Sequence, residues 1–121
     1  MTSYRRGEIV LVKFVFADEK GVKQRPGLIV SVDRYHQSRR EVILAAITSN
    51  VGRLLVGDYD VEGWREAGLP LPSTVTGIIR TIKQDMIVRT LGELAAAELQ
   101  IVDGTLRDVL GLQTPSRRAA T

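Results

Sequence analysis

The side chains that could do chemistry in this chain of 121 residues are few in kind. The sequence has no cysteine and a single histidine, His36. Thiol nucleophiles, disulfides and thiolate metal sites are therefore excluded, and so is a metal centre built from several histidines. The carboxylates are scattered along the chain rather than spaced as metal ligands. Catalysis must then depend on Arg, Lys, Ser, Thr, Tyr, Asp or Glu, and we expect no metal and no other cofactor.

His36 is the first candidate for a general base. It lies in residues 33–40, which are polar apart from Tyr35 and therefore predict a connection between two strands. A histidine in such a segment is more often solvated than catalytic. We accordingly interpret His36 as an exposed loop histidine.

Positive charge is concentrated in the first third of the chain. Residues 1–40 hold nine Lys and Arg against four Asp and Glu, a net of +5, whereas residues 41–80 carry −2 and residues 81–121 are neutral. This asymmetry favours a polyanionic partner, because Lys and Arg that neutralise phosphates release counterions. The alternative is that these charges only keep a small protein in solution.

The composition is typical of a globular protein, with 44% hydrophobic and 26% charged residues. The longest apolar run, residues 42–47, is far shorter than the roughly 20 residues that span a bilayer. No apolar segment precedes Tyr4, so we expect no secretory signal and, with no cysteine, a cytoplasmic protein. We predict one domain over residues 1–113 and a frayed tail over residues 114–121.

The hydrophobic pattern predicts six short strands followed by one helix. Strands are expected over residues 8–16, 26–32, 41–48, 58–61, 73–82 and 86–89. Polar or proline-containing connections are expected over residues 17–24 and 63–73. From Leu94 to Leu110 apolar residues recur every three or four positions, which predicts a terminal helix that Gly111 ends. The fold class is therefore mainly β with a C-terminal helix, as a small bent antiparallel sheet or partial barrel.

Several motifs stand in an order that resembles the MazF/PemK family of toxin ribonucleases from bacterial toxin–antitoxin systems. They are RGEIVLV at 6–12, RPGLIVS at 25–31, ITS at 47–49, GL at 68–69, PS at 72–73, RTI at 80–82 and LGEL at 91–94. The resemblance implies an SH3-like barrel that forms homodimers. It also implies metal-independent cleavage of single-stranded RNA, in which the 2′-hydroxyl attacks phosphorus and leaves a 2′,3′-cyclic phosphate and a 5′-hydroxyl.

Two residues match the family's catalytic positions: Arg25 its arginine and Thr48 its hydroxyl residue. We expect Arg25 to enter the second strand and Thr48 to leave the third, so that neighbouring antiparallel strands bring them together. The alternatives are that Arg25 is an ordinary surface arginine and that Thr48 satisfies a turn amide.

Five further residues are expected to bind RNA: Lys20, Lys23, Ser49, Asn50 and Arg80. Arg80 matches a family arginine that could assist the leaving group or hold a phosphate, although a plain cross-strand ion pair is an alternative. We interpret Ser49 and Asn50 as turn formers rather than catalysts.

Two departures from the family pattern leave its details open. Lys83 follows the RTI motif where many relatives place a carboxylate, which puts any role of the nearby Asp85 in doubt. Residues 17–24 also lack the Gly-Ser-Glu-Gln type of run found in some relatives, so the RNA sequence that is cut could differ.

The partners implied by the resemblance are single-stranded RNA, an antitoxin with an acidic tail and a second copy of the chain. Tyr59 and Trp64 could anchor a protein partner, or Trp64 could pack on its own rim. Two rival functions remain. One is a gyrase-poisoning toxin of the CcdB type, although the chain does not end in the aromatic residue typical of that class. The other is an RNA-binding module without catalysis.

Overall fold

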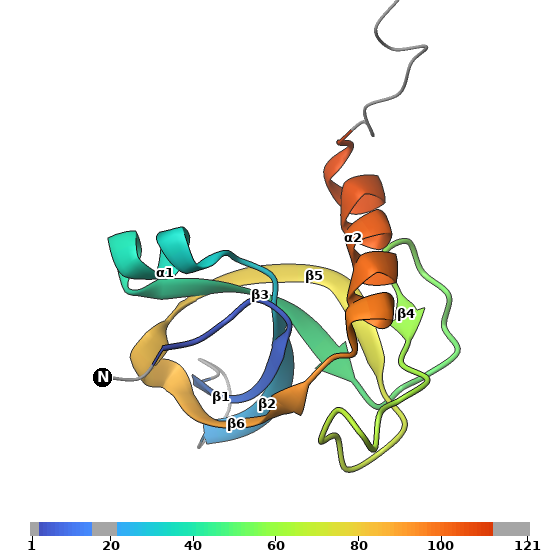
Figure 1. Ribbon diagram of the computed structural model, residues 1–121. Coiled ribbons are helices and arrows are strands. Elements are labelled where there is room, and N and C mark those ends of the chain that lie inside the picture. Colours follow the sequence, from blue (N-terminus) through green and yellow to red (C-terminus); the bar gives the residue numbers. More distant parts are fainter. Residues whose placement is uncertain (1–2, 16–21, 113–121) are drawn as a thin grey trace, which may run out of the picture.

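The computed structural model describes residues 3–15 and 22–112 (Figure 1). The elements in chain order are β1 (Glu8–Val15), β2 (Val22–Ile29), α1 (Asp33–Arg39), β3 (Glu41–Thr48), β4 (Tyr59–Asp60), β5 (Thr74–Lys83), the 3-10 helix η1 (Gln84–Met86), β6 (Ile87–Glu93) and α2 (Ala96–Leu110). No helix in these ranges is long and apolar enough to cross a membrane. The expected tail, residues 114–121, lies outside the described residues.

The strands form an antiparallel six-stranded sheet in the order β4-β5-β3-β2-β1-β6. The sheet curls into a half-barrel, and α2 stands beside β4 and β5 (Figure 1). Shifts of register between β1 and β6 and between β3 and β5 increase the bend, as β-bulges do. The predicted fold class, mainly β with a C-terminal helix, is confirmed.

Apolar residues are buried on both faces of the sheet. On the face that carries α2, Ile9 and Leu28 belong to the same cluster as Val102 of the helix. On the other face, Val10 and Val12 pack with apolar residues of β2, β3, β5 and β6. Since one small cluster joins side chains from five strands, the sheet must be concave on this second face. We call it the concave face.

Two glycines fix the irregular segment between β4 and β5 against β6. A Cβ atom added to Gly68 would lie 2.1 Å from the carbonyl oxygen of Leu91, and one added to Gly92 would lie 2.1 Å from that of Ala67. Gly68 also has a φ of +88°, which disfavours any side chain. The two backbones can touch only because neither position has a side chain.

Strand β2 begins at Val22, earlier than the predicted start at Pro26. Its first half pairs with β1 in a continuous hairpin register from Val15↔Val22 to Ile9↔Leu28. The three residues before Pro26 are polar and exposed, so they lack the apolar signal of a strand. Pro26 itself is tolerated because the β2–β3 pairing begins only at the next residue, which leaves its nitrogen side unpaired.

Helix α1 was not expected, because residues 33–40 are polar and were predicted to be a connection. The helix is too short for an apolar stripe to appear in the sequence, and its one buried residue is a histidine. The helix ends at Arg39, and the C-cap residue Arg40 adopts a left-handed conformation with a φ of 56° although it is not a glycine. The other differences are small: β6 extends to Glu93, beyond its predicted end at residue 89.

Candidate functional site

Arg25 lies within β2 rather than at its entrance, since it is the fourth residue of the strand. It pairs with Val12 of β1, and its side chain is exposed. Directly paired residues of antiparallel strands point to the same face, and Val12 belongs to the cluster on the concave face. The Arg25 side chain therefore rises from the concave face, near the end of the sheet where β1 finishes and β2 starts.

Thr48 is the last residue of β3, as predicted. Its hydroxyl oxygen accepts a hydrogen bond from the backbone N–H of Asn50 at 3.1 Å. The alternative role considered for Thr48, satisfying a turn amide, is therefore present in the structure. This bond leaves one lone pair and the hydroxyl proton for another partner, so the two roles are compatible.

The strand register brings Arg25 and Thr48 to the same end of neighbouring strands. The β2–β3 pairing ends at Gly27↔Ala46, and Arg25 and Thr48 each stand two residues beyond this last pair. Side chains alternate between the two faces of a sheet, so an equal offset of two residues gives both the same face. A guanidinium and a hydroxyl thus belong to the same end of the concave face.

Arg80 joins this face from β5, where it pairs with Leu44 of the concave-face cluster. Its guanidinium carbon lies 4.8 Å from the centre of the Phe14 ring, above the ring. Within the described ranges Arg80 forms no ion pair, so the cross-strand ion pair considered for it is not observed. Phe14 was missed by sequence reasoning, although the alternation of β1 already put it on the face of Val12.

The remaining predicted RNA-binding residues differ in their placement. Lys23 is exposed in β2 and pairs with Phe14, beside Arg25. Ser49 and Asn50 are exposed in the turn after β3, where the Ser49 carbonyl accepts the N–H of Val51 at 3.1 Å. Lys20 lies outside the described residues. Lys23, Arg25 and Arg80 give the concave face positive charge from two strands.

His36 is not an exposed loop histidine, and this prediction was wrong. It is 6% exposed and sits in α1, where Nδ1 lies 2.9 Å from the carbonyl oxygen of Tyr4 and Nε2 lies 2.6 Å from the Ser31 hydroxyl oxygen. A carbonyl can only accept, so Nδ1 donates to the Tyr4 carbonyl, and Nε2 shares a second hydrogen bond with the Ser31 hydroxyl. The same hydroxyl oxygen accepts the N–H of Ile43 at 2.9 Å. His36 therefore joins α1 to Tyr4 in the N-terminal segment and, through Ser31, to β3, which is a structural role.

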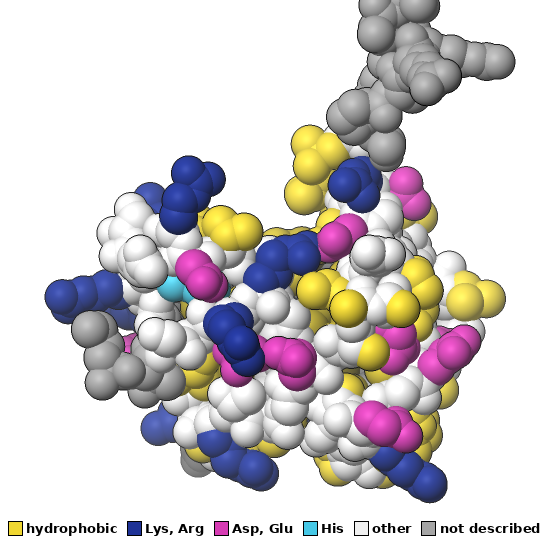
Figure 2. Space-filling view, in the orientation of Figure 1, with side chains coloured by type: hydrophobic (Ala, Val, Ile, Leu, Met, Phe, Trp, Pro, Cys, Tyr) yellow, Lys and Arg dark blue, Asp and Glu magenta, His cyan; other side chains and the backbone are white. Residues whose placement is uncertain are grey.

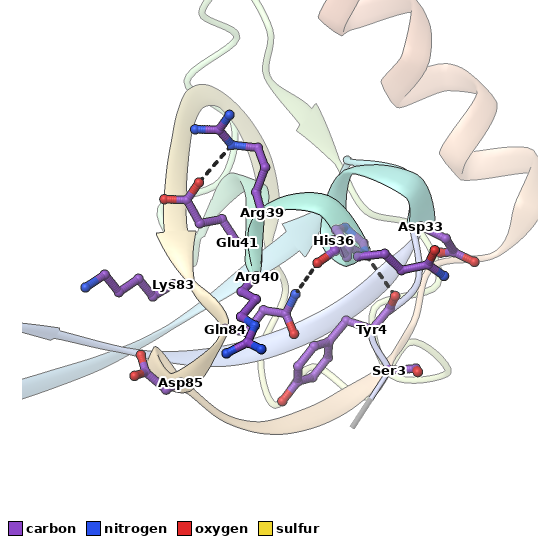
Figure 3. A pocket seen from close by; sticks show the side chains of 11 residues that line it. Ser3, Tyr4, Asp33, His36, Arg39, Arg40, Glu41, Lys83, Gln84 and Asp85 are labelled. Atoms are coloured by element: carbon purple, nitrogen blue, oxygen red, sulfur yellow. Dashed lines mark hydrogen bonds and ion pairs between the residues drawn. The ribbon is translucent and has the colours of Figure 1, made fainter. Parts of the chain in front are cut away.

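A cavity of about 910 Å³ lies beside α1, at the opposite end of β3 from Thr48 (Figure 3). Its lining combines three basic and three acidic residues with His36: Asp33, Arg39, Arg40, Glu41, Lys83 and Asp85. Opposite charges offset one another there, and Arg39 donates to Glu41 at 3.0 Å. None of the predicted catalytic or RNA-binding residues lines this cavity. Lys83, the departure from the family pattern, thus lines a cavity that neither Arg25 nor Thr48 lines.

Trp64 and Tyr59 pack against the protein's own core. Both are half-buried beside the cluster under α2, and the Arg65 guanidinium lies 4.9 Å from the Trp64 ring. The Tyr59 hydroxyl donates to Glu98 at 2.6 Å. Burial, and then the Glu98 carboxylate, raise the pKa of Tyr59 well above its usual value. For Trp64, packing on its own rim is what the structure shows.

An exposed apolar surface lies where three segments meet near the end of α2. Exposed apolar residues of these segments include Leu54 at 81%, Val56 at 77%, Ile78 at 57% and Leu110 at 57%. The segments adjoin, since a Cβ atom added to Gly77 would lie 3.0 Å from the Val56 carbonyl oxygen and would also meet α2. Hydrophobic side chains are visible along α2 and at its C-terminal end (Figure 2). We call these four residues the apolar patch.

No group of three or more His, Asp or Glu side chains that could hold a metal ion occurs within residues 3–15 and 22–112. The chemical resources of the concave face are therefore guanidinium groups, a lysine amine, hydroxyls and an aromatic ring. Guanidinium groups suit phosphate because their planar fork donates to two oxygens at once.

Comparison with known proteins agrees with this fold. A family model described as "PemK-like, MazF-like toxin of type II toxin-antitoxin system" matches residues 5–110. The Mycobacterium tuberculosis toxin MazF-mt6 is 25% identical with a TM-score of 0.73, covering 88% of this chain and 99% of that one. A MazE-MazF structure from Deinococcus radiodurans is 19% identical with a TM-score of 0.78, and the match covers 93% of this chain and 100% of that one. An endoribonuclease in complex with its cognate antitoxin, from a mycobacterial species, is 21% identical with a TM-score of 0.75, and the match covers 93% of this chain and 100% of that one. No curated protein matches the sequence.

Proposed function

Because this chain belongs to the PemK-like, MazF-like toxin family of type II toxin–antitoxin systems, we propose that it is an endoribonuclease that cuts single-stranded RNA. The observation that carries the proposal is that exposed Arg25 and Thr48 stand at the same end of the neighbouring strands β2 and β3, each two residues beyond their last pair, on a basic concave face. Lys23 and Arg80 add positive charge for the RNA backbone on the same face.

In the proposed reaction the 2′-hydroxyl oxygen of one nucleotide bonds to the adjacent phosphorus, and the bond from phosphorus to the next O5′ breaks. The 2′-hydroxyl loses its proton and the departing O5′ gains one, which leaves a 2′,3′-cyclic phosphate and a 5′-hydroxyl. Arg25 stabilises the charge that builds on the phosphorane oxygens. Thr48 orients the 2′-hydroxyl for in-line attack. This scheme needs no metal, because the guanidinium supplies the positive charge.

The test is incubation of the purified protein with a long single-stranded RNA in excess EDTA. We expect discrete cuts with cyclic phosphate ends, and a rate at least about 100-fold lower for Arg25→Ala, the usual cost of losing a transition-state donor. Arg34→Ala is the matched control, because Arg34 is an exposed arginine of α1. Absence of cleavage by the wild type, or equal cleavage by Arg25→Ala, would refute the proposal.

Two protein partners follow from the same proposal. Family membership calls for a cognate antitoxin, and we propose that an acidic segment of it covers the basic concave face. We also propose a homodimer, since the apolar patch would otherwise remain in water. Both partners would act with the toxin in the cytoplasm.

The two rival functions predict different assay results. A gyrase poison would inhibit supercoiling and leave RNA intact. An inactive RNA-binding module would bind RNA with a steep salt dependence and leave it uncut. Doubt about catalysis arose from Lys83, and that residue lines the cavity beside α1 rather than the face of Arg25. The structure therefore gives no specific support to either rival.

A further inference from the structure

We propose that Arg80 and Phe14 form a stacking platform for one nucleobase next to the cut, with Arg80 touching the base and Phe14 supporting Arg80. The proposal rests on the proposed ribonuclease function for the identity of the ligand as RNA. It changes the role expected for Arg80 from the sequence, which was to assist the leaving group or to hold a phosphate.

The first observation is the contact itself. The Arg80 guanidinium carbon lies 4.8 Å from the Phe14 ring centre, although β3 and β2 lie between the two strands in the sheet. Phe14 is half-buried against the concave-face cluster, whereas Arg80 is exposed. The ring therefore has a fixed position, and the guanidinium on it is open to a ligand on its outer side.

The second observation is that no carboxylate of the described residues competes with a ligand for the Arg80 guanidinium. In the described part of the chain Arg80 has no carboxylate partner and no hydrogen bond. By contrast, the Arg39 guanidinium lies over the Tyr35 ring and also donates a hydrogen bond to the Glu41 carboxylate at 3.0 Å. A guanidinium held only by a ring keeps its planar outer surface and its N–H groups for another molecule. Such a plane is a common stacking partner for unpaired RNA bases.

The third observation is the position relative to Arg25. Val12 pairs directly with Arg25, and Phe14 is two residues further along β1 on the same face. Phe14 and Arg25 are therefore diagonal neighbours, whose Cα atoms are about 7–8 Å apart in a sheet. An RNA strand with its reacting phosphate at Arg25 would bring a flanking base over the platform. Stacking there tolerates any base but favours those with larger ring surfaces.

The experiment measures binding of a short RNA whose cut nucleotide carries a 2′-deoxy sugar, so that it cannot react. Each base in turn is replaced by an abasic site, and Kd is measured by fluorescence anisotropy over a series of salt concentrations. For the wild type we expect one flanking position at which loss of the base raises Kd about tenfold. In Arg80→Lys and Phe14→Leu we expect that penalty to fall below about twofold. Arg80→Lys should leave the salt dependence unchanged, since the positive charge remains.

Tyr35→Leu is the matched control, because it removes a second aromatic–arginine pair, in which the Arg39 guanidinium carbon lies 5.6 Å from the Tyr35 ring centre on α1. It should keep the wild-type abasic profile. If Phe14→Leu does not fold, Arg80→Lys still tests the platform. The proposal is overturned if Arg80→Lys keeps the full abasic penalty. It is equally overturned if Arg80→Gln weakens all RNAs uniformly and lowers the slope of log Kd against log salt by about one, as expected for a phosphate contact.

Failure of the platform and failure of the proposed function give different results. A wild-type protein that cuts RNA but shows no position-specific abasic penalty is a ribonuclease without this platform. A protein that cuts no RNA, yet loses a position-specific penalty in Arg80→Lys on a mixed-sequence RNA, has the platform without the proposed activity.

Discussion

The hydroxyl of Thr48 has a use in the fold and a proposed use in the reaction, and single substitutions can separate them. Thr48→Ser keeps the hydroxyl, so both the bond to the Asn50 N–H and the contact to the 2′-hydroxyl remain. Thr48→Val removes both. We expect Thr48→Val to lower the single-turnover cleavage rate about 100-fold and the free energy of unfolding by about 1 kcal/mol, with Thr48→Ser close to the wild type. Wild-type cleavage by folded Thr48→Val would show that the hydroxyl serves the turn alone.

Tyr59 predicts how stability depends on pH in the alkaline range. Burial and the Glu98 carboxylate raise its pKa in the folded protein, whereas an unfolded tyrosine ionises near about pH 10. The folded state thus holds the proton more strongly, so this contribution is complete below about pH 10 and is lost as the pH rises further. We expect the free energy of unfolding, measured in urea, to fall less steeply above pH 10 in Tyr59→Phe. Part of the slope should remain, because burial also raises the pKa of Tyr4. Identical slopes in both proteins would contradict this assignment.

At the scale of elements, backbone contact between glycines joins the irregular segment to β6. A methyl group at Gly68 would lie 2.1 Å from the Leu91 carbonyl oxygen in a backbone with a positive φ, so Gly68→Ala should lower the free energy of unfolding by more than about 2 kcal/mol.

Gly104→Ala is the opposite case, because nothing lies within 4 Å of the added methyl. In a helix that change should raise stability by about 1 kcal/mol. Thermal or urea unfolding measures both, and a Gly68→Ala protein as stable as the wild type would show that the two backbones separate easily.

The elements also show which patterns in a sequence are enough to predict a helix or a strand. The alternation of β1 and β3 and the apolar stripe of α2 predicted these elements correctly, because side chains at regular spacing pack against the core; in α2, Val102 is buried and Leu99 and Leu106 are partly buried beside it. Gly111 ends α2 as predicted, in a left-handed conformation. Helix α1 and the first half of β2 were not, because their stability comes from other parts of the chain. His36 in α1 is held by Tyr4 and Ser31, and the start of β2 is held by its pairing with β1.

For the whole molecule, the apolar patch predicts self-association. We expect the wild type to sediment at twice the 13.4 kDa of one chain, and Ile78→Asp to sediment as a monomer at the same micromolar concentration. A charge inside an apolar interface is costly, and a central residue commonly changes Kd more than about 30-fold. Val32→Asp is the control, because Val32 is a similarly exposed apolar residue, 49% exposed, that precedes α1. A wild-type monomer would exclude the dimer.

The sequence by itself determined the fold class, because strand and helix periods follow from which side chains must leave water. It also limited the chemistry to charged and hydroxyl side chains and indicated Arg25 and Thr48 by their surrounding motifs. Only the tertiary structure decided that Arg80 lies over Phe14, although two strands separate β5 from β1, and that His36 is buried rather than exposed. The physical reason is that register and curvature depend on the packing of all the strands together, whereas a sequence pattern reports each strand alone.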